Sequence, residues 1–225
     1  MLTVPFWAKV KTEVLAAFLA GALPSDASHL SGVKIVEAGR LTAPSGWIVA
    51  GEPYLRGMPA ALSPRVPPGD YPVRLVVFEF PSGDKRVGLA QVVVSDSPVA
   101  RWAFAGTTAE PIEDVPEGEI IGFDVDGGMA AFIDLANAPA LLAVGAEDED
   151  YSDLTRVAYE NYQHTFAWAN YPLGANSGQN LVLFSAGAGD GFYWTYVGLD
   201  ADGQVASFVT DFFLATLSEP VTPTP

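Results

Sequence analysis

The sequence predicts a single β-rich α+β domain, in which antiparallel sheets pack as a sandwich or a partial barrel and helices cover a face or an edge. Two observations carry this prediction. Short apolar and aromatic runs alternate with turn sequences along most of the chain, as strands joined by tight turns do. The 22 glycines and 18 prolines are spread along the chain rather than clustered, which indicates many turns. A chain of 225 residues with 49% hydrophobic residues can bury the core of one sizeable domain.

The N-terminal segment, at about residues 6–22, predicts an amphipathic helix. Its apolar residues recur at helical spacing and would form one stripe. These residues are Phe6, Val10, Val14, Leu15, Phe18, Leu19 and Ala22. A short secretory signal is the alternative, because Lys9 and Lys11 precede an apolar run. Glu13 lies against that run and favours the helix, and no segment reaches the roughly 20 apolar residues of a transmembrane helix.

A second helix is expected from about Asp153 to Trp168, with Ser152 or Asp153 as its cap. Its apolar residues again follow helical spacing, although polar residues interrupt the stripe. The acidic run at 146–153 borders this helix. Such a run is typical of a solvent-exposed segment that leads into a helix, and an attachment site for a basic partner is the alternative.

The clearest hairpin lies between residues 71 and 96, where two β-rich runs flank the turn sequence PSGD. Five prolines exclude a regular element between residues 51 and 70. Further strands are expected at 33–40, at 46–50, at 101–104, on both sides of Gly127–Gly128 within 120–134, and in the block 180–212. We expect residues 1–216 to form one globular domain and residues 217–225 to be a flexible proline-rich tail.

The chain is strongly acidic, with 27 Asp and Glu against 11 Lys and Arg and a formal net charge of −16. This charge repels phosphate backbones and anionic membranes, so it disfavours nucleic-acid and membrane partners and favours a basic protein. The alternative is that the acids only keep the surface soluble. The absence of cysteine excludes disulfides, thiolate nucleophiles and cysteine-ligated metals. It also fits the cytoplasm, where we expect the protein to be located.

Asp124 and Asp126 form the first candidate site. They are one residue apart, so on a strand both carboxylates leave the same face. Two like charges at that spacing would raise one pKa or bind a cation between them. The alternative is structural: Asp126 can set the turn into Gly127 and Gly128 by bonding its own backbone.

Asp190 forms the second candidate site, because it lies between glycines in the sequence GAGDG and precedes an aromatic strand. The glycines leave room for a ligand to approach the backbone. Tyr193, Trp194 and Tyr196, with Phe192, could then wall a pocket, and rings beside carboxylates suit sugars or cationic groups. A tight turn whose aromatic residues are shared between core and surface is the alternative.

Other motifs fit their patterns poorly. The DADG sequence at 200–203 begins like a calcium-binding loop, but Val205 occupies the position that requires glycine, so a hairpin turn is the better interpretation. Ser185 lacks the flanking glycines of a nucleophile elbow. His29 and His164 have no context that marks a catalytic base. No recognisable catalytic or cofactor motif therefore assigns a reaction.

Four segments together resemble a known family. They are PPGDYPVRL at 67–75, SPVARWAFA at 97–105, GFDVDGGMAAFID at 122–134 and GAGDGFYWTYVGLDADGQVASFVTDF at 187–212. In this combination and order they resemble the uncharacterised bacterial family called domain of unknown function number 4241. The resemblance implies a bacterial source and no mechanism. The chain departs from the family pattern at three places. The aspartate-glycine segment is shorter here, since Gly127–Gly128 lead directly into Met129 and Ala130. Ala188 stands in place of an aromatic residue, and Trp194 stands in place of a proline.

Two functional hypotheses follow. The first is a non-enzymatic binding or accessory protein, such as a toxin-neutralising immunity protein, whose acidic surface meets a basic partner. The second is a divalent-metal-dependent hydrolase or ligand-binding domain that uses Asp124, Asp126, Asp134 and Asp190. In that case Asp126 and Asp190 are the candidate metal ligands, and a divalent cation is the expected cofactor.

Overall fold

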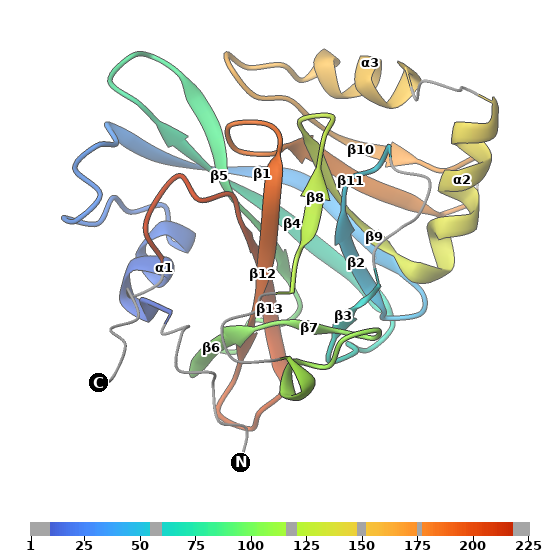
Figure 1. Cartoon of the computed structure of the whole chain (residues 1–225), viewed down its shortest axis with the longest axis horizontal. Coiled ribbons are helices and arrows are strands. Elements are labelled where there is room, and N and C mark those ends of the chain that lie inside the picture. The colour runs from blue at the N-terminus through green and yellow to red at the C-terminus, as the bar shows by residue number, and fades with distance from the viewer. Residues whose placement is uncertain (1–9, 55–59, 116–120, 148–151, 175–176, 218–225) are drawn as a thin grey trace.

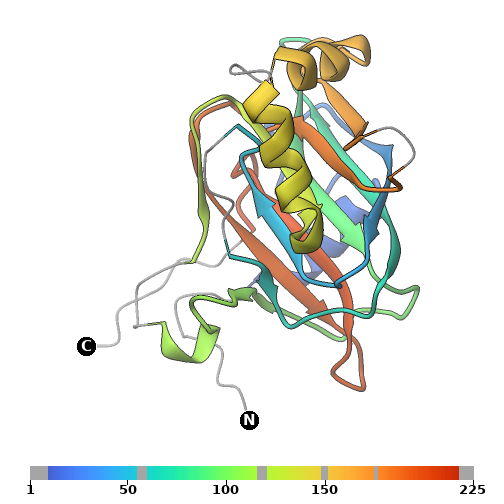
Figure 2. The same ribbon diagram turned by 90° about the vertical axis from the view of Figure 1, so that its right-hand side faces the viewer.

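A computed structural model describes residues 10–54, 60–115, 121–147, 152–174 and 177–217. Within these residues, two antiparallel sheets face each other and helices cover their outer surfaces (Figure 1). Figure 2 shows the arrangement from the side, with α2 lying across the smaller sheet. The predicted β-rich α+β sandwich is therefore confirmed, and the sheets do not close into a barrel.

The larger sheet has seven strands in the order β1-β4-β5-β13-β12-β6, and β8 pairs with the other end of β12. All of its pairings are antiparallel. Its strands are β1 (Gly32–Ala43), β4 (Gly69–Glu79), β5 (Lys85–Val93), β6 (Arg101–Phe104), β8 (Phe123–Val125), β12 (Gly191–Leu199) and β13 (Val205–Asp211). The β4–β5 hairpin, which is the clearest hairpin in the sequence, lies in this sheet between β1 and β13.

The smaller sheet has four strands in the order β10-β11-β9-β2. Its strands are β2 (Ile48–Gly51), β9 (Met129–Asp134), β10 (Trp168–Pro172) and β11 (Asn180–Ser185). A separate two-stranded pair joins β3 (Leu62–Ser63) to β7 (Gly106–Thr107). The strand β3 lies within residues 51–70, where no regular element was expected, and β7 was not predicted, which is the first correction to the predicted elements.

The main core fills the space between the two sheets. Phe132 of β9 and Phe184 of β11 project into it with their ring centroids 5.3 Å apart, and Phe208 of β13 meets them from the larger sheet. Strand residues alternate between the two faces of a sheet, so each sheet also has an apolar outer face that needs a cover. The helices supply these covers.

The outer face of the larger sheet is covered by α1 (Thr12–Leu19), whose Leu15 and Phe18 are fully buried. This helix is shorter than the predicted range 6–22, of which residues 6–9 lie outside the described residues. The outer face of the smaller sheet is covered by α2 (Ala138–Glu147) and α3 (Ser152–Glu160). Short 3-10 helices occur at Ile112–Asp114 and Leu135–Asn137.

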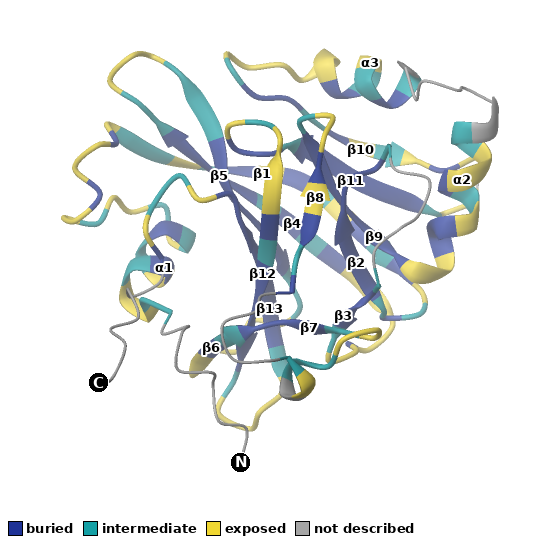
Figure 3. Cartoon of the chain, in the orientation of Figure 1, coloured by how far each residue is buried: buried dark blue, intermediate teal, exposed yellow. Residues whose placement is uncertain are grey.

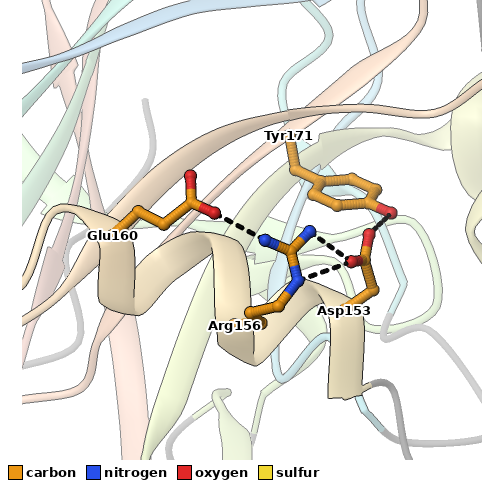
Figure 4. A network of polar contacts seen from close by, with 4 residues as sticks. All are labelled: Asp153, Arg156, Glu160 and Tyr171. Atoms are coloured by element: carbon orange, nitrogen blue, oxygen red, sulfur yellow. Dashed lines mark hydrogen bonds and ion pairs between the residues drawn. The ribbon is translucent and has the colours of Figure 1, made fainter.

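The second predicted helix, Asp153–Trp168, is too long. The helix α3 ends at Glu160, and Trp168 begins β10, which pairs along its length with β11. Figure 4 shows how α3 is attached to this strand: Arg156 bridges Asp153 (2.6 Å) and Glu160 (2.5 Å), and the Tyr171 hydroxyl donates to Asp153 (2.7 Å). The bond from Tyr171, followed by those from Arg156, holds the pKa of the Asp153 carboxyl below its usual value. The helix α2 was not predicted.

Candidate functional site

The two motif turns of the sequence meet at one corner of the sandwich. The turn 126–128 connects β8 of the larger sheet to β9 of the smaller one, and the turn 186–190 connects β11 back to β12. The Ala186 N–H donates to the Gly128 carbonyl oxygen (2.9 Å), which joins the turns directly. We call these two turns the corner; both views show their loops side by side (Figures 1 and 2).

Three of the predicted acids lie at the corner and are exposed. Strand β8 pairs with β12 so that Asp124 faces Phe192 and Val125 faces Gly191. Asp126 directly follows β8 and Asp190 directly precedes β12, so each lies one residue beyond the last pair of the ladder, Val125 with Gly191. No ion pair among the described residues includes Asp124, Asp126 or Asp190.

An exposed aromatic ring lies beside Asp124 at this corner. Phe192 is 43% exposed and, as the partner of Asp124, projects from the same face of the sheet. Its ring lies over the backbone of Gly122, where an added Cβ would be 2.7 Å from the ring. Figure 3 shows exposed residues at the adjoining ends of β8 and β12. We call Asp124, Asp126, Asp190 and Phe192 the corner face.

Tyr193 points inward and holds the glycine-rich turn. Its hydroxyl donates to the carbonyl oxygen of Gly189 (2.8 Å), a residue with φ of 120°, and its ring centroid lies 4.9 Å from that of Phe212. Burial, with a smaller effect from the nearby charge of Asp190, raises the pKa of Tyr193. This tyrosine therefore anchors the turn from inside the core.

Trp194 and Tyr196 lie on the opposite face, the one that α1 covers. The Trp194 ring packs on Phe213 with 4.0 Å between centroids. Tyr196 is fully buried, and its hydroxyl donates to Asp211 (3.3 Å). The four rings thus do not wall one pocket, because Tyr193 points to the opposite face and Trp194 and Tyr196 pack into the cluster that α1 covers.

Asp134 is separated from the other predicted acids. It ends β9, whereas the turn 126–128 precedes β9, so about 16 Å of strand lies between them. The carboxylate is fully buried and accepts the Ser45 hydroxyl (2.7 Å) and the Ala136 N–H (2.9 Å). These bonds connect the end of β9 to the β1–β2 loop, which is a structural role.

Glu52 is the residue of this corner that the sequence analysis missed. It follows β2, is only 1% exposed, and accepts the Asp126 N–H at Oε2 (3.1 Å) and the Gly127 N–H at Oε1. A Cβ at Gly127 would lie 2.6 Å from Oε1 of Glu52 and 2.7 Å from the Tyr54 ring, so the turn requires glycine there. Burial, together with smaller effects that include the charge of Glu52, raises the pKa of Tyr54. The one sequence signal was a glutamate directly after an apolar strand.

The corner does not form a recognisable metal centre. Across the described ranges, no group of three or more histidine, aspartate or glutamate side chains could hold a metal ion. What the corner face presents to solvent is three carboxylates and an aromatic ring. Such a surface can bind a cationic group, because the ring face and the carboxylates both attract positive charge.

A family model described as "Protein of unknown function (DUF4241)" matches residues 41–210, more than half of the chain. The chain belongs to this family. The part that matches the DUF4241 model extends from β1 to β13 and includes both turns of the corner, while α1 precedes it. Comparison with curated proteins and with solved structures gave no match. None of the helices in the described parts of this DUF4241 protein is long and apolar enough to cross a membrane.

Proposed function

We propose that this chain is a non-enzymatic binding or accessory protein of the bacterial cytoplasm, whose acidic surface takes a basic protein partner at the corner face. An immunity protein that neutralises a basic toxin is the specific form of this role. The observation that carries the proposal is Phe192, an exposed ring directly opposite Asp124, at the corner where Asp126 and Asp190 are also exposed. None of these three acids has an ion-pair partner among the described residues.

The contrast with the buried acids supports this proposal. Glu52 and Asp134 each accept hydrogen bonds from backbone N–H groups, so the fold uses their charge. Asp124 and Asp190 accept no hydrogen bond from a described residue, and Asp126 and Asp190 each lie one residue beyond the last pair of the β8–β12 ladder. Like charges at such positions are unfavourable for the free protein, and a bound cationic side chain would remove that repulsion.

The net charge of −16 adds a long-range contribution. A basic partner would be attracted before contact, which raises the association rate and makes binding weaken as salt is added. An arginine is the side chain that the corner face fits best, because its planar guanidinium can lie on the Phe192 ring while it donates to neighbouring carboxylates.

The alternative hypothesis, a divalent-cation site of a hydrolase or ligand-binding domain, concerns the same corner. It would use Asp126 and Asp190, with Asp124 nearby, and Asp134 is too distant along β9 to contribute. No observation in the described residues favours it over binding of an organic cation.

A peptide-binding experiment tests the proposal. Fluorescein-labelled octa-arginine is titrated with the protein at low salt, and the wild type is compared with the triple variant Asp124→Asn, Asp126→Asn and Asp190→Asn. Exposed ion pairs contribute about 0.2–1 kcal/mol each, so loss of three should weaken binding by about threefold to about 150-fold.

The matched control is the triple variant Glu13→Gln, Asp96→Asn and Asp202→Asn, which removes the same number of charges from exposed positions elsewhere. We expect this control to change the affinity by less than the corner variant. Equal losses in the two triple variants would show that only net charge matters, and absence of binding to the wild type at low salt would refute a cation-binding role.

A further inference from the structure

The segment Phe212–Leu217, which we call the strap, connects the end of β13 to α1. After β13 it crosses the outer face of the larger sheet towards the N-terminal helix (Figure 1). The Leu217 carbonyl oxygen accepts the Lys11 N–H (2.8 Å), and the Leu214 carbonyl oxygen lies 2.8 Å from Nε2 of His29. Leu217 is buried in the same cluster as Leu15 and Phe18 of α1. The strap therefore holds α1 on the sheet.

A buried carboxylate lies where the strap begins. Asp211 is 2% exposed; its Oδ1 accepts the Phe213 N–H (2.9 Å) and its Oδ2 accepts the Tyr196 hydroxyl (3.3 Å). Burial raises the pKa of Asp211 to about 7, although both hydrogen bonds act in the opposite direction. The same burial, together with the charge of Asp211, raises the pKa of Tyr196 far above its usual value.

Among the described residues, no cation forms an ion pair with Asp211. From β12 the titratable group in contact is Tyr196, and the residues paired with Asp211 are Trp194 of β12 and Leu89 of β5. Arg86 is the charged residue of β5 opposite Phe78, on the face that α1 covers. The charged residues at the start of α1 are Lys11 and Glu13, and His29 contacts the strap itself. None of the ion pairs among the described residues includes Asp211.

The junction has two further unfavourable features. Phe213 adopts a φ of 56°, a conformation that non-glycine residues rarely adopt. Nε1 of Trp194, whose ring packs on Phe213, is buried and has no hydrogen-bond partner among the described residues. Opening of the strap would relieve both and would let water reach Asp211.

We propose that the strap is a pH-sensitive latch, which holds α1 on the larger sheet while Asp211 is protonated and loosens when Asp211 ionises. A protonated Asp211 is compatible with its buried position, whereas an ionised one is better solvated in the open form. The strap is distinct from the corner face, so this inference does not depend on the proposed function.

The direction of the pH effect follows from the two pKa values. The pKa of Asp211 is about 7 when the strap is closed, against 3.8 for the ordinary group when it is open. The stabilisation of the closed form is therefore complete below about pH 4 and is lost as the pH rises through 7. With these values the equilibrium constant for opening increases by about 100-fold between pH 5 and pH 9.

Hydrogen exchange followed by mass spectrometry tests the latch. Protection factors, corrected for the intrinsic exchange rate, are measured from pH 5 to pH 9 for peptides that cover residues 10–20 and 213–217. We expect both to lose protection by about 100-fold, mostly between pH 5 and pH 7. The opening constant should reach half of its maximum near pH 7, which we take as the midpoint. Peptides of β9 on the smaller sheet serve as the internal control and should keep their protection.

Two variants make the test specific. Asp211→Asn removes the titrating group and should give protection that is independent of pH. Tyr196→Phe removes a hydrogen bond that favours the ionised carboxylate, so it should move the midpoint to higher pH. The latch is refuted if the wild type shows no pH dependence, if β9 loses protection in parallel, or if Asp211→Asn retains the dependence. Should Asp211→Asn fail to fold, an unchanged midpoint in Tyr196→Phe is equally decisive against it.

Discussion

Replacement of Glu52 by glutamine tests whether the corner depends on a buried carboxylate. The two oxygens of Glu52 accept the backbone N–H groups of Asp126 and Gly127. Glutamine has nearly the same shape but only one oxygen, so its amide nitrogen would face one of these N–H groups. One buried donor then has no acceptor, and the remaining hydrogen bond is no longer assisted by charge.

The magnitude follows from these two losses and one gain. An unsatisfied buried donor costs about 1–3 kcal/mol, and exchange of a charged acceptor for a neutral one costs about 1 kcal/mol. Removal of the carboxylate also removes its desolvation cost, which acts in the opposite direction. Because both oxygens of Glu52 are paired, we expect a net loss of about 1–3 kcal/mol, which lowers Tm by roughly 2–12 °C in a chain of this size.

The assay is thermal unfolding at pH 7, followed by far-ultraviolet circular dichroism. Glu110→Gln is the control, since Glu110 is exposed and the change in net charge is the same. The control should melt with the wild type and Glu52→Gln should melt below both. If Glu52→Gln melts with the control, the turn 126–128 does not depend on the carboxylate and our account of the corner is wrong.

Two further predictions concern the same corner. Gly127→Ala should destabilise the fold by about 1–3 kcal/mol, because the added methyl group would overpack against Glu52 and Tyr54. The control Gly83→Ala meets no atom within 4 Å, although Gly83 has a φ of 93°, and should cost less. Equal losses of unfolding free energy in chemical denaturation of the two variants would contradict this. Calcium, magnesium and manganese should leave Tm unchanged, whereas a ligand at 100 times its Kd would stabilise by about 2.7 kcal/mol. A rise in Tm that Asp126→Asn abolishes would instead support the divalent-cation hypothesis.

The elements that the sequence predicted well are those whose signals are local. The β4–β5 hairpin has an apolar strand on each side of a Gly-containing turn, and β6 was predicted with the bounds that the structure shows. Residues 161–168 were assigned to the second helix because their apolar residues follow helical spacing, but α3 ends at Glu160 and Trp168 begins β10, which pairs with β11. Local periodicity does not reveal such long-range pairing. The helix α2 has apolar residues on most sides, so it lacked the polar face that marks a helix in a sequence.

The candidate site was predicted in part. The acids Asp124, Asp126 and Asp190 were identified from their turns, and the antiparallel β8–β12 pairing brings them to one corner. The spacing between Asp126 and Asp134 did not reveal that a whole strand separates them. Glu52 was missed because its partners are backbone N–H groups of a turn distant in the sequence, and such groups have no sequence pattern.

The strand order of the larger sheet has a consequence for how the chain can fold. Strands β1, β4 and β5 form one half, and β6 and β8 reach this half only through the hairpin of β12 and β13. Ser207 of β13 pairs with Val93 of β5, so the central pairing joins residues far apart in sequence. Loop closure of that length is slow, and β5 has an open edge until β13 arrives. A chain emerging from the ribosome therefore cannot complete the sandwich until β13 is available, which makes folding depend on the last of the described strands to be synthesised.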